Sequence, residues 1–350
     1  MAYIRPLLIA FLLAGALIAG LELRLASIGY QPSVTDSAGR WRVERNKASR
    51  LGDNALILVG ASRIQLALDL EVLRRETGKQ PVQLGIVGGS PTPVLVGLAA
   101  DPAITGTIIV DYYDTMSEVA RGDLAERYQK SFDAQKGRTF FGLGGDVIEA
   151  GLTSAVRDHL RMYANGTTPA GSLLLAWSGE LREDYVFMAP DRSSRGDYSR
   201  VLISRAYLSR VMRLLGDIFP PDTPNLERTL QAKVDAISPS SNAAVLRQGP
   251  VIRDAIQTIT RRGGRVLFVK FPSDGMVRQI EDRRYPRALF WDKFVALTGV
   301  TGIQSSDDEV LSGFNCPDGS HLDMRDRAAF TSRLVQVLGL EVTQGNNSPH

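Results

Sequence analysis

Short apolar segments that alternate with helical segments are the feature that most constrains the fold of this chain. Four apolar runs that end in glycine, proline or a polar turn are typical of buried strands: NALILVGAS (54–62), PVQLGIVGGS (81–90), GTIIVDYYD (106–114) and RRGGRVLFVKFP (261–272). Three segments between or after them predict helices: DLEVLRRETG (69–78), PTPVLVGLAAD (91–101) and RAAFTSRLVQVLG (327–339). Strands that alternate with helices in this way predict an α/β fold with a central parallel sheet.

An apolar segment near the N-terminus predicts a membrane anchor. No charged residue occurs between Arg5 and Glu22, a gap of 16 residues. This gap is short for a spanning helix, which needs about 20 residues, but LELRLASIG can extend it, with Glu22 and Arg24 in the headgroup region. We expect residues 5–27 to form an uncleaved, single-pass transmembrane signal anchor in the inner (cytoplasmic) membrane, with Arg5 inside and the main domain in the periplasm. A cleaved signal peptide is the second interpretation, and a buried helix of a soluble protein is the third.

The remaining chain divides into four predicted regions. Residues 28–53 resemble a tether, because they contain Gly, Pro, Ser and mixed charge without sustained periodicity. We expect one α/β domain over residues 54–340, with an insertion over about 116–240 that has helical pieces and no clear alternation of strands and helices. This insertion could form a lid or a cap, or it could be helical packing around the sheet. Residues 341–350 predict a disordered tail.

Composition excludes several classes of function. The net charge is only +3, and the sequence has no dense Lys/Arg stripe interleaved with aromatic residues. It therefore does not predict nucleic-acid binding. The single cysteine, Cys316, excludes an intrachain disulfide and a cysteine-rich zinc site, and three scattered histidines argue against a histidine metal centre. The lack of disulfides favours a bacterial envelope over a disulfide-stabilised secreted protein.

Three residues predict nucleophilic catalysis. Ser62 directly follows the first predicted strand, and ligands gather at the carboxyl ends of strands in parallel sheets. Asp318 and His321 lie three residues apart in CPDGSHLD (316–323), where a turn can place the carboxylate on one imidazole nitrogen and leave the other as a base. Each motif has a simpler interpretation: Ser62 as a turn cap, and His321 as a histidine satisfied within its loop. Together, and before the final helix, they favour a Ser-His-Asp triad.

These motifs resemble the SGNH (GDSL-like) hydrolase superfamily over roughly residues 54–115 and 262–340. Its Gly-x-Ser block matches Gly60-Ala61-Ser62, and its Asp-x-x-His block matches Asp318 to His321. The resemblance implies a three-layer, flavodoxin-like SGNH fold. It also implies a glycine N–H after the second strand as an oxyanion donor, here Gly88 or Gly89.

The Gly-x-Asn-Asp block of the superfamily is absent. The corresponding strand end reads VDYYD, in which Asp111 replaces the glycine, Tyr113 replaces the asparagine and Asp114 keeps the acid. The resemblance therefore offers the Tyr113 hydroxyl as a possible third oxyanion donor. Loss of one such donor costs about a hundredfold or more in rate, which gives some weight to a non-catalytic role.

The anchor, the triad and the missing Asn block together resemble the membrane-anchored SGNH-like proteins of bacterial exopolysaccharide O-acylation. This resemblance implies an O-acyl(acetyl)transferase that acts through an acyl-serine, with a polysaccharide or glycan acceptor and a multi-pass membrane O-acyltransferase as partners. A triad of this kind needs no metal and no organic cofactor. A carbohydrate esterase of the same fold and a non-catalytic polysaccharide-binding assembly protein are the alternatives.

Overall fold

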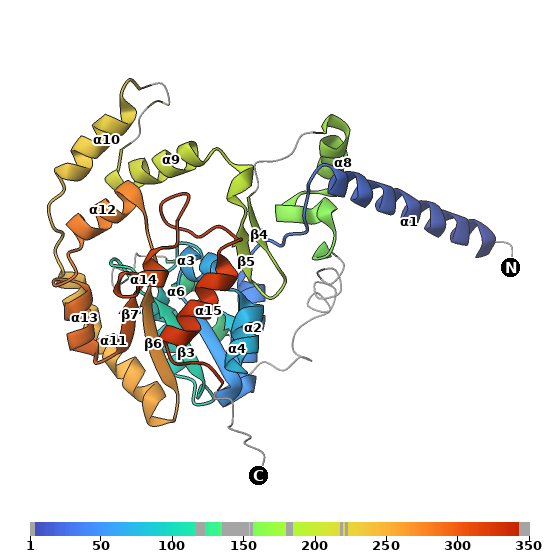
Figure 1. Ribbon diagram of the computed structural model, residues 1–350. Helices are drawn as coiled ribbons and strands as arrows, with labels where there is room; N and C mark the ends of the chain where they lie inside the picture. Colours follow the sequence, from blue (N-terminus) through green and yellow to red (C-terminus); the bar gives the residue numbers. More distant parts are fainter. Residues whose placement is uncertain are drawn as a thin grey trace, which may run out of the picture. The chain divides into compact units, whose positions relative to one another are not determined.

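The computed structural model describes residues 4–116, 123–134, 154, 157–179, 185–217, 220 and 223–342 (Figure 1). The chain forms two compact units. The first contains Met1–Ser37 and Gln135–Pro190, and the second contains Ala38–Ala134 and Asp191–His350.

The second unit is built on a parallel sheet of five strands, as the alternating pattern predicts. The strand order is β2-β1-β3-β6-β7, in which each neighbouring pair is parallel. The bounds of the strands are β1 Ala55–Val59, β2 Gln80–Gln83, β3 Thr107–Asp111, β6 Arg265–Lys270 and β7 Thr301–Gln304. In chain order this is 2-1-3-4-5, an order of doubly wound sheets in which the switch point lies between β1 and β3. In folds of this order, ligands gather at the carboxyl ends of the strands that flank the switch point, here β1 and β3.

The centre of the sheet is buried on both faces because β1, β3 and β6 carry apolar residues at most positions. Ile57 and Val59 point into one core and Leu56 and Leu58 into another. Five helices contribute to the first core: α2 Ala38–Leu51, α5 Pro91–Ala99, α6 Leu124–Asp133, α11 Ala243–Arg261 and α13 Trp291–Thr298. Four cover the other face: α3 Ser62–Ala67, α4 Leu70–Thr77, α14 Glu309–Ser312 and α15 Arg327–Val337. The unit thus has three layers.

Local signals set the ends of the first helices as expected. The Asp69 carboxylate accepts hydrogen bonds from the N–H groups of Glu71 and Val72 and starts α4, and Gly78 ends it in the left-handed conformation. Ser90 caps α5, with Pro91 in its first turn.

The predicted tether over residues 28–53 is wrong for its second half, which forms α2. The Trp41 side chain is buried in the core, and its indole N–H donates to Leu84 O at 3.0 Å. Arg45 is also buried and pairs with Asp101 at 3.0 Å. Because removal of one partner from a buried ion pair costs about 3–5 kcal/mol, α2 is an integral part of the domain.

The predicted insertion over about 116–240 is mainly helical where it is described, but the two units share it. The sheet-bearing unit contains α6, together with β5 Ser194–Gly196, η4 Tyr198–Arg200, α9 Ile203–Leu215 and α10 Leu226–Asp235. Helix α9 packs on α12 Gly275–Arg284 through an apolar cluster that includes Val211, Val277 and Ile280. The remaining short elements of this unit are η1 Gly52–Asn54 and η5 Ser305–Asp307. Residues 343–350 of the predicted tail lie outside the described residues.

The first unit contains the predicted anchor. Helix α1, Ile4–Ser27, has 24 residues and would extend about 36 Å, more than the hydrocarbon thickness of a bilayer. It is long and apolar enough to cross a membrane, and its apolar window is not buried, which argues against the core helix of a soluble protein. The other described elements of this unit are η3 Arg161–Gly166, α8 Pro169–Ser178 and β4 Val186–Met188.

Candidate active site

Ser62 lies at the carboxyl end of β1, where the chain turns into α3. Ser62 is the first residue of this helix, so its half-buried hydroxyl stands at the edge of the sheet. Gly60 precedes it because a Cβ there would lie 2.3 Å from Asp111 Cβ, at the end of the neighbouring strand. The small-residue turn therefore lets β3 approach the serine closely.

Asp318 organises the loop that carries His321. Its Oδ1 accepts the N–H groups of Ser320 at 3.0 Å and His321 at 2.9 Å, which closes the turn. Its Oδ2 lies 2.9 Å from His321 Nδ1. Gly319, between them, has φ +81°, and a Cβ there would clash with Val277. The spacing Asp-Gly-Ser-His thus lets one carboxylate hold both the backbone and the imidazole ring.

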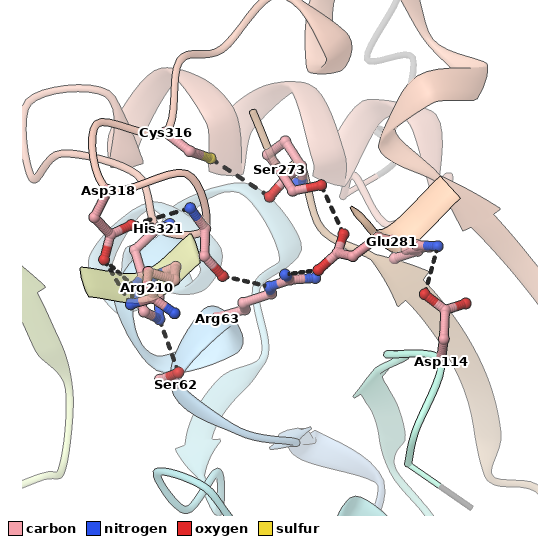
Figure 2. A network of polar contacts seen from close by, with 12 residues as sticks. Ser62, Arg63, Asp114, Arg210, Ser273, Glu281, Cys316, Asp318 and His321 are labelled. Carbon is pink, nitrogen blue, oxygen red and sulfur yellow. Dashed lines mark hydrogen bonds and ion pairs between the residues drawn. The ribbon is translucent and has the colours of Figure 1, made fainter. Parts of the chain in front are cut away.

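His321 joins this loop to the serine (Figure 2). Its Nε2 lies 2.8 Å from Ser62 Oγ, although the two residues are 259 positions apart in the chain. With Nδ1–H donated to Asp318, Nε2 accepts the serine proton, which is the tautomer that a general base requires. The structure therefore brings Ser62, His321 and Asp318 together in the order and with the contacts of a Ser-His-Asp triad.

Arg210 is a fourth member of this cluster, and it was not predicted. It comes from α9, and its Nη2 lies 2.6 Å from Asp318 Oδ2 and 3.1 Å from His321 Nδ1. Burial lowers the pKa of His321, Asp318 raises it, and the charges of Arg210 and Arg63 lower it again, so that the net shift is downward. Burial acts to raise the pKa of Asp318, but hydrogen bonds and charges from His321 and Arg210 outweigh it and hold this pKa below its usual range. Arg210 therefore shares the carboxylate that stabilises the imidazolium.

We expect the substitution Arg210→Gln to raise the pKa of His321, because one cation beside the ring is removed. The base must be neutral to accept the serine proton, so activity is present above the pKa of His321 and is lost as pH falls through it. The acidic limb of the pH profile of kcat/KM for 4-nitrophenyl acetate should accordingly move to higher pH. Arg205→Gln, which removes an exposed arginine from the same helix, is the control and should leave the limb in place. An unmoved limb in the Arg210 variant would contradict this role.

Arg63 fixes the serine turn to the histidine loop. Its Nε donates to Ser320 Oγ at 2.9 Å, and its other end forms an ion pair with Glu281 of α12, which accepts from Ser273 Oγ at 2.7 Å (Figure 2). Burial acts to raise the pKa of Glu281, but the charges of Arg63 and Lys270 outweigh it and lower this pKa. Both ends of the triad are therefore connected by a charged network that does not use the serine hydroxyl.

A pocket of about 360 Å³ opens beside the serine, a size that suits small ligands. Six of its lining residues matter for the chemistry: Ser62, Arg63, Gly88, Asp111, Tyr113 and Arg210. Other walls come from Leu214, Ile280, Arg284 and Tyr285. Both polar and apolar side chains thus line the space beside Ser62.

The three predicted oxyanion donors differ in this pocket. The Gly89 N–H donates to Ile86 O at 2.9 Å. The Tyr113 hydroxyl donates its single proton to Gly89 O at 3.0 Å, so it is committed to this turn. Gly88 lines the pocket, and within the described part of the chain its N–H has no hydrogen-bond acceptor. Of the three predicted donors, the Gly88 N–H is therefore the one that no described acceptor occupies.

Asp111 is a buried carboxyl group in the wall of the same pocket. Its Oδ2 accepts the N–H of Ala61 at 3.2 Å, while its Oδ1 has no partner among the described residues. Burial raises the pKa of Asp111 to about 6, against the opposing charge of Arg63 and the hydrogen bond from Ala61. The neighbouring Asp114 instead pairs with Lys270 at 2.8 Å. Asp111 thus holds the serine turn through its contact with Ala61.

Within the described ranges, no group of three or more His, Cys, Asp or Glu side chains is arranged to hold a metal ion. The buried Cys316 thiol contacts Pro272 O at 3.4 Å, and burial raises its pKa.

Together these features define an α/β protein with a Ser-His-Asp cluster at the switch point of its sheet. Neither a protein-family model nor a curated protein sequence matches the chain.

Proposed function

We propose that this protein is an SGNH-type O-acyl(acetyl)transferase of the bacterial cell envelope, which transfers an acyl group to a polysaccharide through an acyl-serine. The observation that carries the proposal is the pair of contacts at His321, with Nε2 2.8 Å from Ser62 Oγ and Nδ1 2.9 Å from Asp318 Oδ2. The five-stranded parallel sheet in the order 2-1-3-4-5 supports the flavodoxin-like SGNH fold that the sequence motifs predict.

In the first half-reaction, Ser62 Oγ attacks the carbonyl carbon of an acyl donor while His321 Nε2 takes the serine proton. The Ser62 and Gly88 N–H groups stabilise the tetrahedral oxyanion. The bond between the acyl carbon and the leaving group then breaks, and His321 returns the proton to the leaving group. Asp318 stabilises the imidazolium throughout.

In the second half-reaction, a sugar hydroxyl attacks the acyl-serine and gives its proton to His321. The ester bond to Ser62 breaks, and the serine recovers its proton from the imidazolium. The pocket beside Ser62 offers the tyrosines Tyr113 and Tyr285 and the arginines Arg210 and Arg284 to a glycan. Hydrolysis, the reaction of a carbohydrate esterase, shares every step up to the acyl-serine.

The apolar helix α1 supports a location at the cytoplasmic membrane, where Arg5 would remain inside and the sheet-bearing unit would work in the periplasm. A periplasmic enzyme has no supply of cytoplasmic acyl donors. A multi-pass membrane O-acyltransferase is therefore the partner that we propose to deliver the acyl group.

Incubation of the purified protein with 4-nitrophenyl acetate is expected to produce one acetyl adduct, which peptide mass spectrometry should locate at Ser62. The Ser62→Ala variant should give no adduct. Because the second half-reaction needs an acceptor, the adduct should persist when the protein is quenched early in the absence of glycan. A folded protein that gives no adduct at Ser62, or gives it equally in the alanine variant, would contradict the proposal.

A further inference from the structure

Helix α8 presents an apolar face to solvent. Its sequence, PAGSLLLAWS, contains no charged residue. Leu173, Leu174 and Trp177 lie on one side of it and are 58%, 73% and 92% exposed. Trp41 and Trp291, the other two tryptophans of the chain, are buried. Such a contiguous apolar surface on a soluble domain normally marks a contact site.

The opposite side of α8 is fastened to the C-terminal end of α1 (Figure 1). Arg24 Nε donates to Ala176 O at 3.1 Å. Leu175 and Ala176 pack against a small core formed with Leu21 and Leu25 of α1. The position of α8 along α1 is therefore fixed within this unit, and its exposed face is the one turned away from these contacts.

The level at which α8 is attached is the level at which the apolar part of α1 ends. Glu22 and Arg24 are the first charged residues after Arg5. The Glu22 carboxylate accepts the N–H groups of Arg161 and Met162 at 3.0 and 2.9 Å, so η3 is attached at the same level. Where α1 spans a bilayer, this level is the headgroup region, in which tryptophan is enriched.

We propose that α8 is an interfacial helix that inserts Leu173, Leu174 and Trp177 into the boundary between headgroups and acyl chains of the bilayer that α1 spans. The lipid surface is the occupant because the face lies at the level where the apolar part of the membrane-spanning helix α1 ends, and because it carries no charge that a polar protein surface would match. The inference rests on the membrane anchor of the proposed function. It adds a second contact with the same membrane, which would fix the tilt and rotation of this unit relative to the bilayer.

The full-length protein can test this contact because Trp177 is the exposed tryptophan. The protein is reconstituted into phosphatidylcholine vesicles with acyl chains brominated near the headgroup, and tryptophan emission is compared with that in unbrominated vesicles. The emission of Trp177 is obtained as the difference between the unsubstituted protein and the Trp177→Phe variant. We expect brominated lipid to quench most of this emission, and we expect iodide in solution to quench little of it. Leu174→Asp should reduce this quenching, whereas Leu202→Asp, at an exposed leucine outside α8, should not.

Flotation of the vesicles after carbonate washing separates this inference from the anchor itself. If the protein floats but Trp177 is not quenched by brominated lipid, α1 is a membrane anchor and the interfacial role of α8 is overturned. This result is expected if the exposed face of α8 instead binds another segment of this chain, or a protein partner that is absent from pure lipid vesicles. If the protein does not float at all, the anchor fails and the inference fails with it. Since Trp177 is exposed, its replacement by phenylalanine should leave the fold intact.

Discussion

Replacement of Ser62 by alanine should lower kcat for a model ester by about 10⁵-fold or more, because the nucleophile is lost while the pocket remains. The hydroxyl contacts His321 Nε2 and is only half-buried, so its removal leaves no buried polar group without a partner other than the imidazole. We therefore expect the thermal unfolding midpoint to change little. Measurement of single-turnover rates with 4-nitrophenyl acetate, together with thermal unfolding, separates loss of chemistry from loss of fold.

The contact between Ser62 Oγ and His321 Nε2 predicts that the effects of replacing these two residues on the rate are not additive. His321→Ala should cost about as much as Ser62→Ala, and the double variant should be no slower than either, because each substitution already disables the same step. Ser312→Ala, at an exposed serine of α14, is the matched control and should retain full activity. If the fold loss of rate in the double variant equals the product of the two single fold losses, Ser62 and His321 do not act as one unit.

The sheet was largely predictable because its strands are buried on both faces. In β1, all five residues are apolar and buried, and the same holds for most of β3 and β6. Such strands stand out in a sequence as short apolar runs between turns. Residues typical of helix starts, Asp69 as the N-cap of α4 and Pro91 in the first turn of α5, then located these two helices correctly.

Two of the elements that escaped prediction, β7 and α2, did so for opposite reasons. Strand β7 is short, lies at the edge of the sheet and has only Gln304 buried, so its sequence carries no apolar run. Helix α2 is rich in charge, and it is integrated through a few side chains rather than through a continuous apolar stripe. Trp41 fills the core, and Arg45 is neutralised by Asp101, which lies 56 residues away in the chain. A pairing at that distance has no local signal.

The same limit applies to the site. The triad could be predicted because its residues belong to two short motifs, Gly60-Ala61-Ser62 and Asp318 to His321. Both motifs are expected at the same edge of the sheet. Arg210 could not be predicted, since it is one of several arginines on an amphipathic helix and meets Asp318 only through tertiary packing, 108 positions away. Which of the predicted oxyanion donors is available depends on which N–H and hydroxyl groups already form hydrogen bonds within the local turn. This depends on the conformation of residues 86–89 and not on their identity.

A glycan acceptor is expected to accelerate the loss of the acyl group from Ser62 and to carry that group away as an ester. Chemistry up to the acyl-serine is the same for a transferase and an esterase, so substitution of the triad cannot separate them. The difference lies in which hydroxyl reaches the intermediate. The pocket beside Ser62 is open enough to admit water, so a transferase must favour the sugar hydroxyl by binding and orienting it.

The required preference can be estimated. With about 10 mM glycan against about 55 M water, a tenfold excess of transfer over hydrolysis needs an advantage of about 5 × 10⁴, which lies near the lower end of the effective molarities that well-oriented reactants reach. The measurement is intact-mass detection of acetyl-Ser62 over time, with and without neutral and uronic-acid oligosaccharides, followed by analysis of the sugar for ester groups. Maltose, added at the same concentration, controls for non-specific alcoholysis.

The expected result is slow decay in buffer and decay about tenfold faster with one class of oligosaccharide, in which the lost acetyl groups appear on the sugar. Arg284→Gln should reduce this acceleration without changing the decay in buffer, because Arg284 lines the pocket and does not contact the triad. If acetyl-Ser62 decays at the same rate under all conditions and acetate is the sole product, the protein is an esterase and not a transferase. The triad geometry would remain valid in that case, but the acceptor hydroxyl would be that of water.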